Sequence, residues 1–317
     1  MTEKILSLFK APKFEWKAIA IPVMTFSVFL LIWAAAASQI KTNLGIVPGP
    51  VEVWGQVRSL ASEYSEENAK KKEFYVYEKE RVEKKRAENP GQEIRGRKYS
   101  GKPTFPGQIA TSLLTVFTGF LIAALIAIPL GILCGLSRPL MTALNPLIQI
   151  FKPVSPVAWL PIVTMIVSAV YTTPKPWLEK CFIISAFTVS LCSLWPSLVN
   201  TALGVASIDK DYLNVARVLR LKLSTKIFKI VLPSAMPYIF AGLRISLSVG
   251  WMVLIAAELL SQNPGLGKFV WDEFQNGSSQ SLARIMVAVF TIGIIGFILD
   301  RIMVILHKAV SFNPEHA

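Results

Sequence analysis

Six apolar runs, each long enough to cross a lipid bilayer as a helix, constrain the fold of this chain more than any other feature. At about 1.5 Å per residue, roughly 20 apolar residues cross the hydrocarbon core, where only a helix or a closed barrel satisfies its own backbone. Hydrophobic residues make up 53% of the chain and charged residues 17%, a balance that excludes an ordinary soluble protein. The sequence therefore predicts an all-α integral membrane fold with six transmembrane helices. The runs are 18–37, 109–136, 146–171, 181–199, 239–260 and 285–306.

The third run differs from the others because prolines and one charge interrupt it. Pro146 lies at its start, Pro153, Pro156 and Pro161 lie inside it, and Lys152 falls among them. Each interior proline removes a backbone hydrogen bond and kinks or breaks a helix. Broken backbone at membrane depth is tolerated where neighbouring protein covers it. We therefore expect a broken element that is buried against its neighbours.

Basic residues beside the apolar runs predict an orientation, because the cytoplasmic loops of membrane proteins are enriched in Lys and Arg. One assignment puts the N-terminal segment 1–17, the link after the second run, the basic segment that follows the fourth run and the tail 309–317 in the cytoplasm. The N-terminal segment precedes a run that is too long for the core of a signal peptide, so we expect it to be retained. The sequence predicts a multi-pass membrane protein with both termini in the cytoplasm. The basic residues used here are Lys4, Lys10, Lys13, Lys17, Arg138 and Lys308.

Residues 38–108 form the longest segment outside the apolar runs, and this orientation places them outside the cell. The part 41–103 carries 14 Lys and Arg residues against 10 Glu, but long loops translocate largely regardless of charge. Two interpretations of this insert remain open: a solvated helical hairpin that only extends the chain, or a docking surface in 62–102 for an external partner. A Glu/Lys-rich stretch 66–88 follows apolar residues that recur at helical spacing, namely Val51, Trp54, Val57, Leu60 and Tyr64.

The sequence contains no clear catalytic, metal-binding or nucleotide-binding motif. Cys134, Cys181 and Cys192 each lie in an apolar run without metal-ligand spacing, which is typical of small buried residues. The nearest match to a phosphate-binding loop, 91–98, has Arg97 where the motif requires Lys, and no apolar strand precedes it. We expect no catalytic, cofactor-binding or metal-binding residue in this chain, and we expect any motor to be another subunit. Glu258 and Asp300 are the only acids in the later runs, so a carboxylate relay is not predicted.

The basic segment between the fourth and fifth runs has the pattern of an amphipathic helix over about 209–222. Asp209 is a candidate N-cap, and together with Asp211 it places negative charge at the positive end of the helix dipole. Such a helix would lie along the membrane surface, and one interpretation is that it only fixes the topology. The predicted apolar stripe consists of Tyr212, Val215, Ala216, Leu219 and Leu223.

The stretch from "NVARVLR" to "IVLP" resembles the EAA signature of ABC importer permeases, which reads Glu-Ala-Ala, three residues, Gly, nine residues, Ile, any residue, Leu-Pro. "DYLNVARVLRL" is similar to the nitrate/bicarbonate branch of that family. The similarity covers roughly 18–52 and 107–308, and includes "VPGPVEVW", "NPLIQIFKPVSPVAWLPI", "SLWPSLVNTALGV" and "GLGKFVWDEF". The signature is matched at Ala216, Ile230, Leu232 and Pro233, and it is replaced at Asn214, Val215 and Arg220.

This resemblance implies the permease of a type I ABC importer in a bacterial inner membrane, with a helix 18–37, an external loop 38–108 and a five-helix core 109–308. It implies a homodimer, two cytoplasmic ATPase subunits that bind ATP and Mg, and an external substrate-binding protein. The implied cargo is a small inorganic anion, nitrate first, with bicarbonate, nitrite, cyanate, sulfonate or taurine as alternatives. The short cytoplasmic helix would be the coupling helix that contacts the ATPase through Asp209, Asp211, Tyr212, Asn214, Val215, Ala216, Arg217, Leu219 and Arg220.

Polar residues within the apolar runs are candidates for lining a translocation path, because hydroxyl groups hold an oxyanion weakly enough to release it. Interhelical hydrogen bonding is the alternative for each hydroxyl. Arg244 could attract an anion or extend toward the headgroups, and Asp300 with Arg301 suggests a pair at the membrane boundary. A secondary transporter or channel is a rival class, and it predicts transport without an ATPase. The candidate path residues are Thr164, Ser168, Ser185, Thr188, Ser193, Arg244, Ser246 and Ser248.

Overall fold

The computed structural model describes residues 16–37, 39–42, 45–88, 96–172, 178–278 and 280–310, and most of them lie in helices. Two short strands, β1 (Lys41–Thr42) and β2 (Gly45–Ile46), pair in antiparallel register. The predicted all-α membrane class is confirmed. The predicted location of the termini concerns 1–15 and 311–317, which lie outside the described residues.

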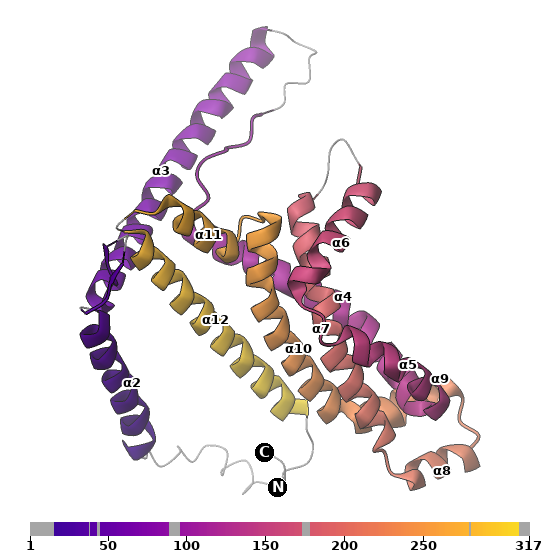
Figure 1. Cartoon of the computed structure of the whole chain (residues 1–317). Helices are drawn as coiled ribbons and strands as arrows, with labels where there is room; N and C mark the ends of the chain where they lie inside the picture. The colour runs from indigo at the N-terminus through magenta and orange to yellow at the C-terminus, as the bar shows by residue number, and fades with distance from the viewer. Residues whose placement is uncertain are drawn as a thin grey trace, which may run out of the picture.

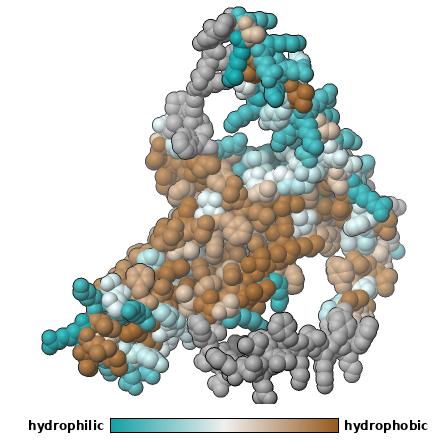
Figure 2. All heavy atoms as spheres, turned by 180° about the vertical axis from the view of Figure 1, so that it is seen from behind, coloured by the Kyte–Doolittle hydropathy of each residue, from teal (hydrophilic) through white to brown (hydrophobic). Residues whose placement is uncertain are grey.

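The apolar runs become helices that are long enough to cross a membrane. Within the described ranges, five helical stretches pass this test, and a bent pair can supply a sixth span. An apolar surface band lies between more hydrophilic ends of the molecule in Figure 2, as expected for a chain that crosses a bilayer. The five helices are α2 (Trp16–Ala37), α4 (Phe105–Leu136), α7 (Lys180–Ala206), α10 (Leu232–Ser261) and α12 (Ser281–Val310).

The third run forms the bent pair, α5 (Arg138–Phe151) and α6 (Pro156–Val170), which meet at an angle of 101°. The predicted break is therefore confirmed, but its predicted burial is not, because Phe151, Lys152 and Pro153 at the bend are exposed on the single chain. The helix begins earlier than 146, and Arg138 is its first residue and not part of a link. Ser137 alone separates α4 from α5, and its Oγ accepts a hydrogen bond from the Leu140 N–H at 3.4 Å. Proline at the first turns of α5 and α6 suits a helix start, because the N–H it lacks has no helical partner there.

α7 is the central helix of the bundle and packs along α4 on one side and α10 on the other (Figure 1). Small residues allow this close approach. A Cβ atom at Gly131 of α4 would lie 2.6 Å from Thr201 Cβ and 2.8 Å from the Leu198 carbonyl oxygen, so a larger residue does not fit. The core cluster beside this contact contains Ala127, Ile148 and Leu198.

The helices extend beyond the apolar runs that predict them. A 27-residue helix such as α7 is about 40 Å long, which exceeds the hydrocarbon thickness, so its ends reach into the polar region where apolar residues are not required. α10 is preceded without interruption by α9 (Leu223–Lys226) and the π-helix η1 (Ile227–Val231), which together form an apolar stretch over Leu223–Ser261. Two short helices, α8 (Lys210–Val218) and α11 (Leu266–Asn276), lie at opposite ends of this stretch (Figure 1).

The charged insert is built on α3 (Pro50–Glu88), a single helix of 39 residues. Its first part packs Val53 and Leu60 against α11 and α12. Its second part extends away from the bundle, and an extended segment returns beside it (Figure 1). The Tyr99 hydroxyl donates to Glu67 at 2.7 Å and so attaches this segment to the helix. The predicted helical hairpin is wrong, because the described return segment 96–104 contains two glycines and a proline and forms no helix.

Candidate functional site

The helix α8 forms the candidate coupling surface, and its start is fixed by a side chain. Asp209 is the N-cap, and its carboxylate accepts a hydrogen bond from the Asp211 N–H at 3.0 Å. This confirms the predicted cap. Asp211 lies in the first turn, where its negative charge complements the helix dipole.

The end of α8 depends on the backbone of Arg220, which has a φ of 47°. This left-handed conformation ends the helix, and the Leu221 N–H bonds to the Ala216 carbonyl at 3.0 Å. The helix therefore stops at Val218 and does not continue to 222 as expected. The EAA pattern has Gly at the position of Arg220, and Gly adopts this conformation without steric cost. This chain keeps the turn with a larger residue.

The predicted apolar stripe of α8 separates into an exposed part and a buried part. Tyr212 is 62% exposed, Val215 54% and Leu219 63%, whereas Ala216 is 3% exposed. Leu223 belongs to the next helix, α9. We call Tyr212, Val215 and Leu219 the α8 face. Ala216 is therefore not part of the surface that a partner could contact.

Charged and polar side chains surround the α8 face. The exposed residues Asp211, Asn214, Arg217 and Arg220 lie on the same short helix or at its end. Figure 2 shows hydrophobic and hydrophilic surface side by side at this lower end of the molecule. An exposed apolar patch rimmed by polar residues is typical of a protein docking site.

The candidate hydroxyl residues fall into separate groups in the folded chain. Ser193 and Ser246 meet between α7 and α10, where the Ser246 hydroxyl donates to the Ser193 carbonyl at 2.5 Å. Ser246 also contacts the Ser197 hydroxyl at 2.7 Å, and Ser185 contacts Ser261 at 2.7 Å. Interhelical hydrogen bonding is thus what Ser185 and Ser246 do in this structure.

The remaining hydroxyl candidates lie apart from that contact. Thr188 donates to the Ile184 carbonyl at 2.8 Å and Ser248 to the Arg244 carbonyl at 3.1 Å, so both bond within their own helices. Thr164 and Ser168 lie on α6, a different helix. Among the predicted path residues, the structure therefore joins Ser193 with Ser246 across two helices and Ser248 with the Arg244 backbone within one helix.

Arg244 of α10 is paired with Asp300 of α12. Its Nε and one terminal nitrogen donate to the two carboxylate oxygens at 2.6 and 3.0 Å. Such a bidentate pair offsets the positive charge that was expected to attract an anion. The predicted pairing of Asp300 with Arg301 is wrong, because Arg301 instead stacks over the Phe297 ring at 4.9 Å.

A buried polar cluster at the other end of α10 was missed by sequence reasoning. Glu258 is fully buried, and both of its carboxylate oxygens lie within 2.9 Å of the Ser112 hydroxyl of α4. It also accepts from the Gly267 N–H at 3.0 Å, while Ser112 accepts from the Leu266 N–H at 2.9 Å. Glu258 was noted only as an isolated acid, since its hydroxyl partner lies 146 residues earlier. The glycines of "NPGLG" were the one local sign of a closely packed site, because a Cβ atom at Gly265 would collide with the Glu258 carboxylate.

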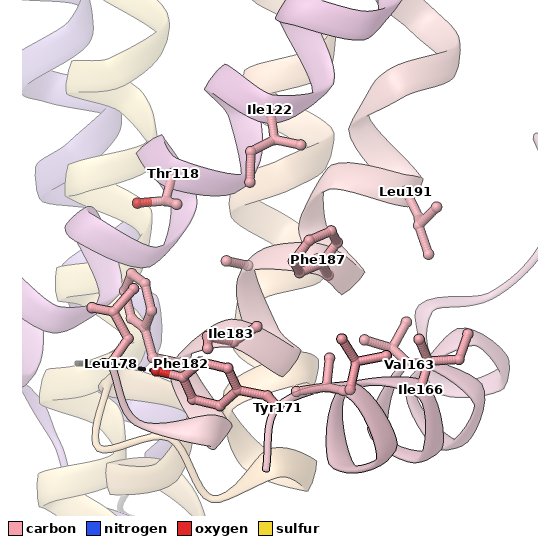
Figure 3. A pocket seen from close by; sticks show the side chains of 13 residues that line it. Thr118, Ile122, Val163, Ile166, Tyr171, Leu178, Phe182, Ile183, Phe187 and Leu191 are labelled. Atoms are coloured by element: carbon pink, nitrogen blue, oxygen red, sulfur yellow. Dashed lines mark hydrogen bonds between the residues drawn. The ribbon is translucent and has the colours of Figure 1, made fainter. Parts of the chain in front are cut away.

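A cavity of about 560 Å³ lies between α4, α6 and α7 (Figure 3). Its lining is apolar apart from Thr118 and Tyr171, and the Tyr171 hydroxyl accepts a hydrogen bond from the Leu178 N–H at 3.3 Å. It offers no charged group to an anion. In the described residues, no group of three His, Cys, Asp or Glu side chains is placed to hold a metal ion.

Comparison with known proteins links these features to transport. Residues 127–312 match the model of a family described as "Binding-protein-dependent transport system inner membrane component". The chain is 38% identical over 204 residues to the nitrate import permease protein NrtB of Synechococcus elongatus, covering 64% of this chain and 69% of that protein. It is 35% identical over 296 residues to the bicarbonate transport system permease protein CmpB of the same organism, covering 93% and 90%.

The fold is similar to a solved transporter structure. An inward-facing structure of the MetNI methionine ABC transporter aligns with a TM-score of 0.55 at 15% sequence identity. The alignment covers 65% of this chain and 96% of that one. At this identity the similarity concerns the fold alone.

Proposed function

Because this chain belongs to the family of binding-protein-dependent transport system inner membrane components, as an ABC importer permease of the nitrate and bicarbonate group, we propose that it forms the path through which nitrate enters the cell. Bicarbonate is the second candidate, since relatives with both names are of similar identity. Nitrite and cyanate share the small size and single charge of these anions.

The exposed α8 face is the surface through which we propose that an ATPase subunit acts on the permease. An apolar patch with a charged rim, on a helix whose start is fixed by a cap, fits a groove in another protein. We assign that groove to a cytoplasmic ATPase subunit, which supplies ATP and Mg binding, so that α8 and both termini lie inside. Two copies of the permease and two ATPases form the transporter, and an external binding protein delivers the anion.

Continuity from α8 to the membrane core supports this assignment. α9, η1 and α10 follow α8 closely and cross the bundle as one helical stretch. Closure of two ATPases would move the paired α8 helices together and rock the attached spans, which alternates access to a central path. The contacts of Ser193 with Ser246 and of Arg244 with Asp300 lie along α10 and would change during such a movement.

Transport by the reconstituted complex tests the proposal. Proteoliposomes with the permease, its cognate ATPase and the external binding protein should take up labelled nitrate only with ATP, and excess bicarbonate, nitrite or cyanate should be tested as competitors. Vesicles with the permease alone are the control. Uptake by the permease alone would establish the rival secondary transporter or channel and overturn the assignment of α8.

The insert is a second part of the proposal. We assign residues 62–102 to contact with the external binding protein, because α3 extends past the bundle with Tyr75 and Tyr77 exposed among charged residues. Replacing 62–102 by a short Gly/Ser linker should weaken complex formation with the binding protein while ATPase binding stays unchanged. Unaltered affinity for the binding protein would refute this role.

A further inference from the structure

The elbow between α5 and α6 lies beside the middle of α7. Phe151, the last residue of α5, stacks on Trp195 of α7 with ring centroids 6.1 Å apart and contacts Trp159 of α6 at 5.6 Å. α7 runs from Lys180 to Ala206, so Trp195 lies about 22 Å from one end and about 16 Å from the other. The elbow is therefore close to the middle of the bilayer.

A positive charge lies at this elbow. Lys152 follows Phe151 directly, and its side chain is exposed on the surface of the single chain. It makes no ion pair within the part of the chain that the structure describes. An ionisable side chain at membrane depth is costly, and it faces a polar cavity or a functional path far more often than lipid.

Two hydrogen-bond donors without partners lie beside the same ring. The indole nitrogens of Trp159 and Trp195 are buried, and neither has an acceptor among the described residues. An indole N–H can only donate, and a buried donor without an acceptor destabilises a fold. Trp251 shows the usual outcome in this chain, because its N–H donates to the Ile292 carbonyl at 3.0 Å. The elbow therefore combines an unpaired cation with two unpaired donors.

We propose that this elbow, defined by Lys152, Trp159 and Trp195, is the point at which the permease holds its oxyanion during passage. The inference rests on the proposed function and specifies its binding site. Lys152 supplies the opposite charge, and the indole N–H groups donate to the oxygens of a planar anion such as nitrate or bicarbonate. One cation and two neutral donors bind weakly enough to release the anion. Both indole nitrogens are covered in this conformation, so the anion reaches them when the bent pair α5 and α6 opens.

Tryptophan to phenylalanine substitutions test the donors, because they remove the indole N–H and keep an aromatic ring. The ring volume that is also lost is the same in the Trp251→Phe control. Uptake is measured in the full complex with saturating binding protein, using whichever of nitrate, nitrite, cyanate or bicarbonate the wild-type complex transports. The vesicles contain phosphatidylcholine only, so anionic headgroups cannot supply the ligand. We expect Trp159→Phe and Trp195→Phe each to lower the uptake rate about tenfold. Their unfolding temperatures should fall less than that of Trp251→Phe, because all three variants lose ring volume but only Trp251→Phe also loses a satisfied hydrogen bond.

Trp251→Phe is the matched control, because it removes an N–H that already has an acceptor within the chain. It should lower the unfolding temperature and leave uptake per folded transporter within about twofold. At the exposed Lys152, Lys152→Met should lower uptake at least as much as the indole variants, whereas Lys152→Arg should keep most of it.

The outcomes separate this inference from the proposed function. Wild-type uptake rates in Trp159→Phe, Trp195→Phe and Lys152→Met, in a complex that transports an anion, would refute the elbow and leave the proposed function intact. A loss of uptake in the indole variants that is matched by the loss of stability seen in Trp251→Phe would also refute it. A wild-type complex that transports none of these anions would refute the proposed function itself.

Discussion

The two ends of the α9–α10 stretch carry short amphipathic helices with opposite surroundings. α11 follows α10, and its apolar residues Leu266 and Phe269 are buried against the chain's own core. α8 precedes α9, and its apolar face of Tyr212, Val215 and Leu219 is exposed. Both helices have an amphipathic sequence pattern. They differ because the apolar side of α11 packs against the chain's own core, whereas the α8 face packs against no other part of the described chain. The proposed contact with the ATPase would cover the exposed α8 face.

The largest expected effect comes from removing what holds α11. Glu258→Ala leaves the Ser112 hydroxyl and the Gly267 N–H buried without an acceptor, so we expect the free energy of unfolding to fall by about 3 kcal/mol. Glu258→Gln keeps one acceptor oxygen and should cost less than half of that. Chemical unfolding in detergent measures both, with Glu52→Ala at an exposed site as the control. Equal stability of Glu258→Ala and wild type would mean that α11 is held by apolar contacts alone.

A charge on the exposed α8 face should act on coupling and not on stability. Val215→Asp is expected to lower ATP-driven uptake at least about tenfold, because burying an unpaired carboxylate in the ATPase interface is costly, while the unfolding temperature stays unchanged. Val51→Asp, at an exposed valine of α3, is the matched control and should leave uptake unchanged. Uptake, ATP hydrolysis and unfolding temperature are measured in parallel. Full activity of Val215→Asp would remove α8 from the interface.

Ala216→Asp sharpens the same comparison because Ala216 is buried within the chain. An aspartate there is expected to lower both uptake and the protection of the α8 amides from hydrogen exchange, since it disturbs the helix itself. A pure coupling defect with normal amide protection would place Ala216 on the docking face after all.

A smaller effect is expected at the end of α8. Arg220→Gly removes the steric cost of the left-handed conformation and should stabilise the turn by up to about 1 kcal/mol. Arg217→Gly lies inside the last helical turn, where glycine should destabilise by about the same amount. Hydrogen exchange of the α8 amides should therefore slow in the first variant and accelerate in the second. Identical exchange in both variants would exclude a role for the backbone of Arg220.

The smallest expected effect concerns the attachment of the return segment to α3. Hydrogen bonds from the Arg81 side chain and the Arg97 N–H lower the pKa of Glu78 from 4.5 to about 2. The attachment is therefore fully stabilised above pH 4.5 and is lost as the pH falls toward 2. Distances between spin labels at 71 and 98 should broaden over that range. Glu78→Gln should already be broad at pH 7, and a narrow distribution in that variant would contradict the assignment.

Local patterns allowed the membrane class, the broken third span and the α8 cap to be predicted. Each depends on residues that are close in sequence: apolar runs for the spans, prolines for the break, and Asp209 before a helical turn for the cap. The end of α8 at Val218 was mispredicted because the apolar spacing continues past the left-handed turn that ends the helix. The insert was mispredicted because the spacing within α3 does not show whether the segment that follows it is helical or extended.

The contacts of the polar residues could not be predicted from local sequence patterns. Arg244 and Asp300 are 56 residues apart, Glu258 and Ser112 are 146 apart, and Trp159 meets the Phe151 ring only because the chain bends by 101°. Whether a polar side chain is paired, buried or free depends on which helices are neighbours. That information is not contained in the spacing of one helix.

By itself the sequence determined that this chain spans a membrane, where it breaks, and that a capped basic helix lies between two spans, because hydrophobicity, proline geometry and capping act over a few residues. The tertiary structure alone decided which apolar helix face stays exposed, which charges are neutralised and which donors remain unpaired. These properties depend on packing between segments that are distant in the chain, and the free energy of burying a polar group depends on the partner that packing provides.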